Sequence, residues 1–342
     1  MLLSVTAESR PTMNDVARAA GVSLKTVSRV VNGETTVAPD LAARVHAAVD
    51  SLNYRPHIGA SMLRRNDRRT RTIGVLLEDV GNPFSAALHR AIEDESRPRG
   101  VQVLTASVDE DPQRERDLAA AFTERHADGL IIAPSGPDQS YLRSFPDIPV
   151  VLVDRPGTGF AADTVLATNV SGSRDAVRHL VSHGHRRIAY LGDHDRVATA
   201  RERHRGYLAA LGAAGLVPHA ARRLRHPSYA ESATLALFDR GAPPTALFTS
   251  QNLITIGAVR ALRRLGLQRR VALVGFDDFL LADLLDPAVT VVAQDPARMG
   301  RTAARALFDR IYGAEGAARE MPPREFWIPT RLIPRGSGEI PA

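Results

Sequence analysis

Two helical patterns follow each other near the start of the chain. Apolar side chains recur three or four residues apart, as on the buried face of a helix: Val16, Ala17 and Ala20 in the first pattern, then Val27, Val30 and Val31 in the second. Gly21 between them tolerates the positive φ of a sharp turn. Thr12 with Asp15 predicts a capping arrangement for the first helix, and Ser23 predicts a cap for the second.

A third helix is predicted from Pro39, a residue favoured at the first helical position. Its apolar face comprises Leu41, Val45, Ala48, Val49 and Leu52. The three helices form a small bundle that ends near Tyr54. The second helix turns polar and basic side chains outward, namely Lys25, Ser28, Arg29 and Asn32. This is the layout of a helix-turn-helix that places one helix in the DNA major groove.

From Thr72 onward, short β-branched runs alternate with helical stretches. Seven runs are predicted to be buried parallel strands: TIGVLL (72–77), VQVLTA (101–106), GLIIAP (129–134), VVLVD (150–154), RIAYLG (187–192), TALFTS (245–250) and VALVGF (271–276). About ten strands in all are too many for one small sheet, so the pattern favours two doubly wound lobes with a cleft between them.

Ligands of doubly wound sheets bind at the carboxyl ends of the strands. In this chain those ends place Asp154 and Asp277 beside the predicted cleft, together with the loops after Leu77, Thr105 and Ser250. We therefore expect the small-molecule site of the core to be built from these segments.

The net charge is concentrated at the N-terminal end. Residues 1–72 contain 11 Lys and Arg against 6 Asp and Glu, whereas the whole chain of 342 residues has a net charge of +6. A basic module attached to a nearly neutral body is typical of proteins that bind a phosphate backbone. Lys25, the only lysine of the chain, has an alternative interpretation as a solvated surface residue in an arginine-rich protein.

Composition and the absence of certain motifs argue against several classes of protein. The chain has no cysteine, which leaves no disulfide, thiolate metal site or cysteine nucleophile and suits a cytoplasmic protein. Residues 1–11 are too weakly apolar for a signal peptide, and no run approaches the roughly 20 apolar residues that span a bilayer. We find no nucleophile elbow, phosphate-binding loop, dinucleotide fingerprint or zinc-protease motif, and so expect neither catalysis, nor a metal, nor a cofactor. The histidines of HGHRRI (183–188) favour a turn over a metal site.

Several motifs together resemble the lac repressor (LacI/GalR) family of transcriptional regulators. They are DVARAAGVSLKTVSRVVNG, LNYRP, HGHRRIAYLG, PTALFTSQNLITIGAVRALRRLGL, VALVGFDD and TVVAQDPARMG. The resemblance covers about residues 12–335. It implies a three-helix DNA-binding domain (12–56) after a lead-in (1–11), a hinge (57–71) and a two-lobed core like the periplasmic binding proteins (72–335), with a short tail (336–342). In the core it implies an N-lobe of about 72–168 plus 296–320, and a C-lobe of about 169–293 plus 321–335.

The resemblance also implies how DNA is bound. Members bind a pseudo-palindromic double-stranded operator as homodimers, and the absence of a heptad tail favours a dimer over a tetramer. The recognition positions are Leu24 and Lys25, with Arg29 one turn later; Leu24 has an alternative interpretation as a packing residue. The wider set of implied DNA contacts is Thr12, Ser23, Thr26, Ser28, Asn32, Tyr54, Arg55, His57 and Ala60, with Leu63 as the wedge of a minor-groove hinge helix.

For the core, the resemblance implies a small-molecule effector, usually a sugar or sugar derivative. Arg203 matches an arginine that donates to ligand hydroxyls, and Asp154 matches the acidic residue of the cleft. The other implied contacts are Phe84, Thr199, Tyr229, Asn252 and Gln294. Phe84 has an alternative interpretation as a loop anchor. Many members have Asn-Asp where this chain has Gln251-Asn252, and an amide both donates and accepts, so the ligand differs from a plain hexose.

Three other classes share parts of this pattern. A sugar kinase or dehydrogenase would leave the DNA-binding module unexplained, and an exported solute-binding protein would need a signal peptide. A nonspecific architectural DNA protein would not need some 260 residues of ligand-binding core. A salt-sensitive mobility shift restricted to one palindrome and altered by a metabolite would fit the regulator alone.

Overall fold

A computed structural model describes residues 11–31, 34, 36–54, 69–239, 241–313 and 321–342. The chain divides into two compact units, residues 1–70 and 71–342. None of the helices among the described residues is both long and apolar enough to cross a membrane.

The N-terminal unit contains the three predicted helices, α1 (Met13–Ala20), α2 (Leu24–Val31) and α3 (Pro39–Ser51). Thr12 and Asp15 form the predicted capping box, and Gly21 turns the chain with a φ of 62°. Ser23 Oγ accepts from Thr26 N at 3.1 Å and so caps α2. Arg44 of α3 donates to the carbonyl oxygen of Ala20 at 2.7 Å, which ties α3 to the end of α1. The expected bundle is therefore confirmed.

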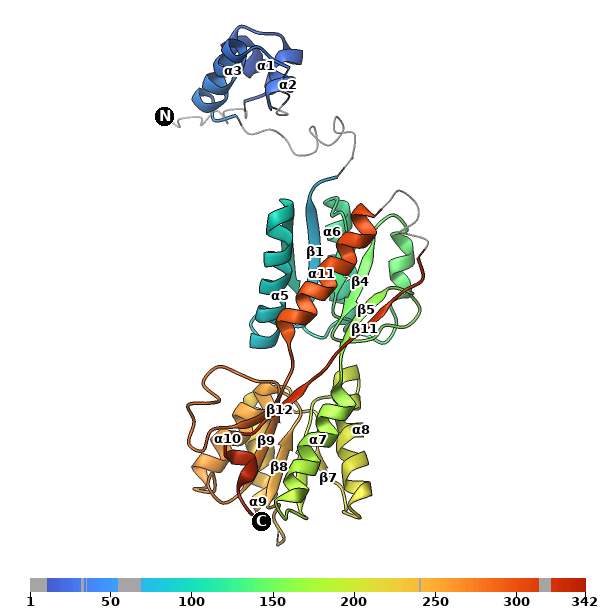
Figure 1. The fold of residues 1–342 in the computed structure, drawn as a ribbon, viewed down its shortest axis with the longest axis vertical. Helices are drawn as coiled ribbons and strands as arrows, with labels where there is room; N and C mark the ends of the chain where they lie inside the picture. The colour runs from blue at the N-terminus through green and yellow to red at the C-terminus, as the bar shows by residue number, and fades with distance from the viewer. Residues whose placement is uncertain (1–10, 32–33, 35, 55–68, 240, 314–320) are drawn as a thin grey trace, which may run out of the picture. The chain divides into compact units, whose positions relative to one another are not determined.

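The first lobe of the core is a six-stranded parallel sheet with the order β11-β5-β4-β3-β1-β2 (Figure 1). Its strands are β1 (Thr72–Leu77), β2 (Gln102–Ser107), β3 (Leu130–Ile132), β4 (Val150–Val153), β5 (Asp163–Ala167) and β11 (Glu325–Ile328). Its helices are α5 (Pro83–Ser96), α6 (Pro112–Glu124), α11 (Pro296–Tyr312) and the short η1 (Arg97–Arg99) and η2 (Ser140–Ser144).

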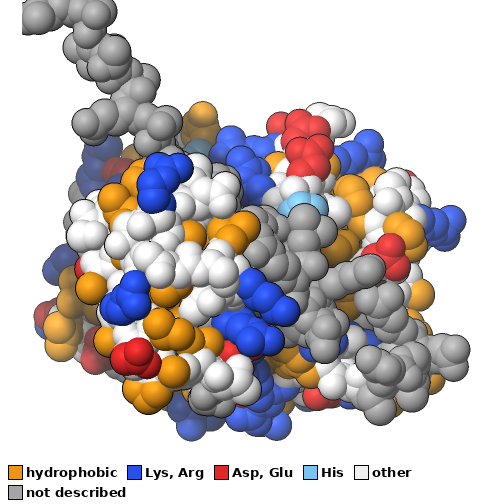
Figure 2. Space-filling model, turned by 90° about the horizontal axis from the view of Figure 1, so that it is seen from above, with side chains coloured by type: hydrophobic (Ala, Val, Ile, Leu, Met, Phe, Trp, Pro, Cys, Tyr) orange, Lys and Arg blue, Asp and Glu red, His pale blue; other side chains and the backbone are white. Residues whose placement is uncertain are grey.

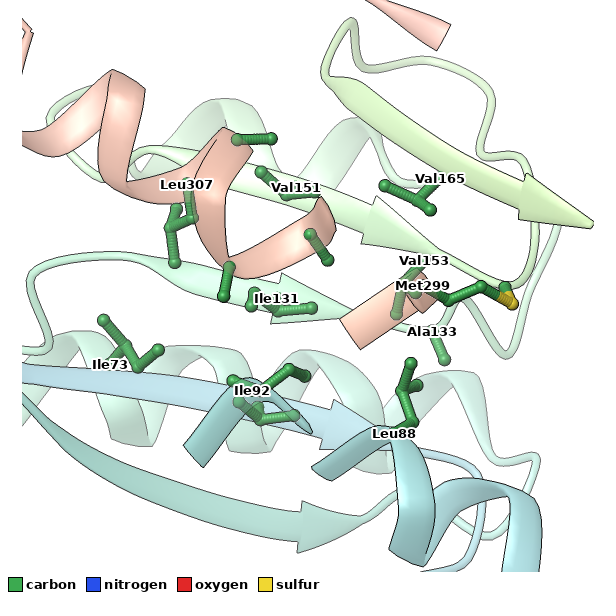
Figure 3. Close-up of a cluster of buried hydrophobic side chains, with 14 of the residues drawn as sticks. Ile73, Leu88, Ile92, Ile131, Ala133, Val151, Val153, Val165, Met299 and Leu307 are labelled. Carbon is green, nitrogen blue, oxygen red and sulfur yellow. The ribbon is translucent and has the colours of Figure 1, made fainter. Parts of the chain in front are cut away.

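Helices α5 and α11 cover one face of this sheet. Figure 3 shows Leu88, Ile92, Met299 and Leu307 of these helices packed over strand residues such as Ile131. Helix α6 and η2 pack on the opposite face. Strands buried on both faces carry the near-continuous apolar runs from which they were predicted.

The second lobe has the order β12-β10-β9-β8-β6-β7, in which only β12 is antiparallel to its neighbour. Its strands are β6 (Ile188–Leu191), β7 (His219–Ala221), β8 (Ala246–Thr249), β9 (Ala272–Phe276), β10 (Thr290–Ala293) and β12 (Arg331–Ile333). Its helices are α7 (Asn169–Ser182), α8 (Ala198–Ala213), α9 (Pro227–Phe238), α10 (Asn252–Arg264) and the short η3 (Ser337–Glu339). Helices α7 and α8 cover one face of the sheet, and α9 and α10 cover the other.

The chain passes between the lobes three times: after β5, after β10 and after β11. The sequence predicts that the third crossing lies near residue 320, which would place residues 325–328 in the second lobe. This prediction is wrong, because these residues form β11, which pairs with β5 in the first lobe. The crossing therefore falls at residues 329–330, where Thr330 N donates to Thr168 Oγ1 at 2.9 Å. The position of a short strand in the sequence does not determine its lobe. The strand with which it pairs does.

Two further expectations need correction. Strand β2 was predicted to be buried, but it is the edge of its sheet and its side chains are exposed or half-buried. The sequence predicts a short tail after residue 335, but Ser337 is buried and donates to the carbonyl oxygen of Leu273 at 2.6 Å. His185 of HGHRRI bonds to Thr245 Oγ1 and to the carbonyl oxygen of Ile340, so it fastens this C-terminal segment to the lobe.

Candidate functional site

A cleft of about 420 Å³, partly open to solvent, lies between the two lobes at the carboxyl ends of their strands. The loops after β1, β4, β6, β8 and β9 contribute to it, as does the second crossing between the lobes. The lining residues are Glu78, Asn82, Phe84, Asp154, Arg155, Asp193, Val197, Thr199, Ala200, Arg203, Ser250, Gln251, Asp277 and Gln294.

Arg203 is held rigidly on the second-lobe side of the cleft. Its Nε donates to Asn169 Oδ1 at 2.8 Å, and its Nη1 donates to the carbonyl oxygen of Ser250 at 2.7 Å. The same Nη1 lies 3.3 Å from Asp277 Oδ2, and the guanidinium stacks on the Phe276 ring at 4.0 Å. These contacts use Nε and Nη1, so the other edge of the guanidinium can donate to a ligand.

Two aspartates mark the strand ends on opposite sides of the cleft. Asp154 follows β4 with a φ of 67°, and Asp277 follows β9 with a φ of 69°. A short acidic side chain tolerates this left-handed conformation better than a bulky one, which helps to explain why aspartate occupies both turns. Gln294 donates through Nε2 to Asp277 Oδ1 at 2.7 Å, so it links the crossing segment to the second lobe.

A buried charge cluster forms the first-lobe side. Arg155 lies 2.6 Å from Glu110 Oε1, 3.4 Å from Asp154 Oδ2 and 3.6 Å from Glu78 Oε2. Burial raises the pKa of the Asp154 carboxyl against the opposing effect of Arg155. For Arg155, burial disfavours the charge, but the surrounding carboxylates outweigh it and raise the pKa of the guanidinium.

Glu78 joins this cluster to the second lobe. Burial is the main reason that its pKa rises to about 7, with Glu110 and Asp193 adding to the rise and Arg155 and Arg225 opposing it. Arg225, from the segment between β7 and α9, lies 3.7 Å from Glu78 Oε1 and donates to the carbonyl oxygen of Asp109 at 3.0 Å. The lobes are therefore connected at the edge of the cleft by an arginine.

In the N-terminal unit, α2 exposes the predicted recognition side chains. Leu24 is 44% exposed, which argues against its alternative interpretation as a packing residue, and Lys25 is exposed as well. Arg29 is exposed and lies 3.4 Å from Glu34. Thr12, Ser23 and Thr26 form the caps described above. Figure 2 shows the whole molecule from above, with Lys and Arg side chains scattered among acidic, apolar and uncharged ones.

Comparison with known proteins identifies both parts of the chain. Residues 12–57 match the model of bacterial regulatory proteins of the lacI family, and residues 177–338 match a periplasmic binding protein-like domain. The chain is 33% identical over 334 residues to the HTH-type transcriptional regulator PtxS of Pseudomonas aeruginosa, with 96% of each chain covered. The chain belongs to the lacI family. This lacI-family regulator is also 31% identical to the ribose operon repressor of Escherichia coli K12, over 88% of this chain and 93% of the repressor.

Solved structures agree with this membership. The lac repressor dimer bound to operator and the anti-inducer ONPF matches 96% of this chain and 99% of its own, with a TM-score of 0.82 and 25% identity. A LacI family regulator from Enterococcus faecium with bound ribose matches 78% of this chain and 98% of its own, with a TM-score of 0.69 and 26% identity.

The cleft of this lacI-family regulator gathers five of the seven predicted effector residues: Phe84, Asp154, Thr199, Arg203 and Gln294. Tyr229 is wrong, because it is 61% exposed on α9 and does not line the cleft. Asn252 is also absent from the lining: it is fully buried, and its Nδ2 donates to Asn82 Oδ1 of the first lobe. It joins the lobes instead of facing the cavity.

The sequence prediction missed Glu78, Arg155 and Asp193. Each lies just beyond the end of an apolar strand, so the strand-end rule that selected Asp154 and Asp277 could have found them. Gln251, noted only as a departure from the family pattern, lines the cleft and donates to Asp193 Oδ2 at 2.9 Å.

Among the predicted DNA contacts, Tyr54 needs correction. Its side chain is only 9% exposed and packs in the hydrophobic core of the N-terminal unit with Val16 and Val45. A residue in this position stabilises the bundle and offers little surface to DNA. Ser28, also among the expected contacts, is half-buried on α2. The remaining expected contacts, Asn32, Arg55, His57, Ala60 and Leu63, lie outside the described residues.

Proposed function

We propose that this lacI-family regulator binds a pseudo-palindromic operator as a homodimer and represses a metabolic operon under the control of a small polyhydroxylated effector. The observation that carries the proposal is the joining, in one chain, of a helix-turn-helix that exposes Leu24, Lys25 and Arg29 to a two-lobed core whose cleft is lined with hydrogen-bonding side chains. In this proposal the core binds its ligand and performs no catalysis.

Lys25 and Arg29 carry the proposed sequence reading. Both project from α2, which corresponds to the recognition helix of the motif, and an arginine or lysine in the major groove can donate to the O6 and N7 atoms of guanine. Arg29 is held near Glu34 in the free protein. DNA binding would exchange this exposed ion pair, worth little in water, for a contact with a base or a phosphate.

A patch of exposed leucines supports the homodimer. Leu280, Leu281 and Leu284, in the segment between β9 and β10, are 81%, 54% and 74% exposed. Exposed apolar side chains gathered in one segment mark an interaction site more often than isolated ones do. A second copy of the chain is the proposed occupant, because a two-fold dimer matches a palindromic operator and the similar lac repressor structure is a dimer on operator.

The cleft has the donors and acceptors that a polyol requires. Arg203 offers the free edge of its guanidinium, whereas Asp154 Oδ1 and Gln294 Oε1 are buried acceptors with no hydrogen-bond partner among the described residues. Phe84 at the wall of the cleft provides an aromatic surface against which the apolar face of a sugar ring can pack. We assign effector binding to these residues together with Thr199.

We further propose that the hinge couples the two sites. The proposed hinge, residues 57–71, precedes β1 in the sequence, and its residues 57–68, including the proposed wedge Leu63, lie outside the described residues. An effector that changes the closure of the lobes would change the separation of the two Thr72 ends in a dimer. Thermodynamic linkage then requires that operator and effector alter each other's affinity by the same factor.

The proposal is tested by a mobility-shift titration. The purified chain is titrated with duplexes from the DNA beside its own gene and with scrambled duplexes of equal composition, at several salt concentrations. We expect one palindrome to be bound more tightly than its scrambled control, with a steep salt dependence, and polyols to be found that change this affinity. Equal binding of palindrome and control would contradict the proposal.

A further inference from the structure

The cleft contains more negative than positive side chains. Four carboxylates line it, those of Glu78, Asp154, Asp193 and Asp277, whereas the lining cations are Arg155 and Arg203. Two charged residues outside the lining form ion pairs with it, Glu110 with Arg155 and Arg225 with Glu78, one of each sign. With every one of these groups ionised the surplus is two negative charges, and it becomes smaller as Glu78, whose pKa burial raises to about 7, takes up a proton.

The arginines are already engaged with particular carboxylates. Arg203 is paired with Asp277 at 3.3 Å. Arg155 is closest to Glu110, at 2.6 Å, and also approaches Glu78 and Asp154. Arg225 approaches Glu78 at 3.7 Å. These contacts leave Asp193 as the lining carboxylate with no arginine within 4.0 Å among the described residues.

Asp193 is held by neutral donors alone. Its Oδ1 accepts from His194 N at 2.6 Å, and its Oδ2 accepts from Gln251 Nε2 at 2.9 Å. On the other side of the cleft, Asp154 is 9% exposed and its Oδ1 is buried without a hydrogen-bond partner among the described residues. Burial raises the pKa of both carboxyls, so a cation bound beside them would favour their ionised form.

A ligand enclosed by the lobes lies close to these negatively charged side chains. The hydroxyls of a neutral sugar can donate to the carboxylate oxygens, but they leave the net charge uncompensated in a site from which water has been displaced. Burying an unpaired charge is far more costly than burying a hydrogen-bonded neutral group. An anionic sugar acid would increase the imbalance, whereas a ligand cation would reduce it.

We propose that the effector is an aminated polyol, of the chemical class of the amino sugars, whose ammonium group binds the Asp193 carboxylate while Asp154 Oδ1 accepts a second hydrogen bond. This inference rests on the proposed function, because it specifies the ligand of the same cleft. Gln251 orients Asp193 for this contact through the bond to its Oδ2, and Arg203 remains available for the hydroxyl groups of the ligand.

The test compares matched ligands that differ in one group. Isothermal titration of the full chain with D-glucosamine, D-galactosamine and D-mannosamine is set against D-glucose, D-galactose and D-mannose, and against D-glucuronate and D-galacturonate. We expect at least one amine to bind tenfold or more tightly than its parent sugar, and no uronate to exceed it. Binding led by a neutral sugar or a uronate, or no binding by any of the three amines, would overturn the proposal.

Substitution of Asp193 tests whether its carboxylate causes the preference for an amine over the parent sugar. Asp193→Asn keeps the size of the side chain but removes its charge, and should bring the affinity ratio of the amine to its parent sugar close to one. Asp195→Asn is the matched control, because Asp195 is exposed and paired with Arg222 outside the lining, and it should keep the wild-type ratio. An Asp193→Asn protein with an unchanged ratio would refute the assignment.

Operator binding separates this inference from the function on which it rests. If a neutral or anionic polyol binds the cleft and changes the affinity for the palindrome, the regulator stands and the aminated ligand is refuted. If an amine binds through Asp193 but leaves the affinity for the palindrome unchanged, the charge inference is supported and control by this ligand is refuted. Both outcomes follow from the same purified protein.

Discussion

Asn252 Nδ2 donates to Asn82 Oδ1 at 2.9 Å, which joins the start of α10 in the second lobe to the residue that caps α5 in the first. Asn82 Oδ1 also accepts from Phe84 N at 3.0 Å. One buried oxygen therefore serves both a helix cap and a contact between the lobes, immediately beside the cleft. This bond is therefore a direct contact between the lobes beside the cleft.

The asymmetry of this pair gives a stability prediction. Asn252→Ala removes the bond between the lobes and should cost about 1 kcal/mol, whereas Asn82→Ala also removes the cap of α5 and should cost about 1 kcal/mol more. The double variant should lose less than the sum of the two single losses, because the bond between the lobes is lost only once. Urea unfolding followed by the fluorescence of Trp327, the only tryptophan, measures these values; fully additive losses would show that the two residues are not coupled.

Arg203 should be sensitive even to a substitution that keeps its charge. Arg203→Lys retains a cation but loses the planar fork that reaches Asn169, Ser250 and the ligand. Each charge-assisted bond lost is worth about 1.5 to 3 kcal/mol, so effector affinity should fall tenfold or more. Arg201→Lys, at an exposed position of the same helix, is the control. Calorimetry measures the effector affinity of both variants. Equal affinities would show that Arg203 does not contact the ligand.

Variants of the DNA-binding residues should be of two kinds, those that lose sequence-specific binding and those that lose binding to any DNA. Lys25→Ala should weaken the operator more than random DNA, by about 1 to 3 kcal/mol if the lysine contacts a base edge. Arg65→Ala, in the hinge (residues 57–71), should weaken binding to both kinds of DNA similarly. Fluorescence anisotropy with both duplexes measures the difference, and parallel losses for Lys25→Ala and Arg65→Ala would contradict base reading by Lys25.

Glu34 provides a gain-of-affinity variant at the same surface. Its carboxylate pairs with Arg29 in the free protein and would lie near DNA phosphates in the complex. Glu34→Gln should therefore strengthen binding to operator and random DNA alike, most clearly at low salt, where exposed charges are least screened. Weaker binding by this variant in anisotropy titrations would show that Glu34 supports the recognition helix.

The raised pKa of Glu78 predicts a stability change with a definite sign. Burial raises this pKa from 4.5 to about 7, so the folded protein holds the proton more tightly than the unfolded chain. Glu78 then favours the folded state below pH 4.5, and this contribution is lost as the pH rises through 7. Glu78→Gln should match the wild type near pH 4 and be the more stable protein at pH 8. Thermal unfolding at both values tests this, and a variant less stable at pH 8 would show that the ion pairs of Glu78 prevail.

Much of the fold could be predicted because its signals are local. The cap at Thr12, the turn at Gly21 and the apolar strand runs are decided by residues close together in sequence, and all are present in the structure. Strand β11 was placed in the wrong lobe because four residues carry no information about a partner that lies more than 150 positions away. The exposed edge position of β2 likewise depends on its neighbours in the sheet.

The residues of the cleft could be predicted only where the signal is local in sequence. Asp154 and Asp277 follow directly from the strand-end rule, but the separation of Asn252 from the cavity depends on its bond to Asn82 across the lobes. Tyr54 and Tyr229 were assigned by their place in the chain, and burial decides against the first and exposure outside the cleft against the second. Side chains whose role depends on contacts distant in sequence require the folded structure.

Selection of binding sites from a random duplex library tests the central claim most directly, since it needs neither a known operator nor a known effector. The full chain is incubated with the library, the bound DNA is recovered and sequenced, and the enriched sites are measured again with Lys25→Ala. We predict enrichment of a palindrome, and Lys25→Ala should weaken binding to both of its half-sites equally. Enrichment of asymmetric sites, or of no sequence at all, would contradict a dimer that reads an operator through α2.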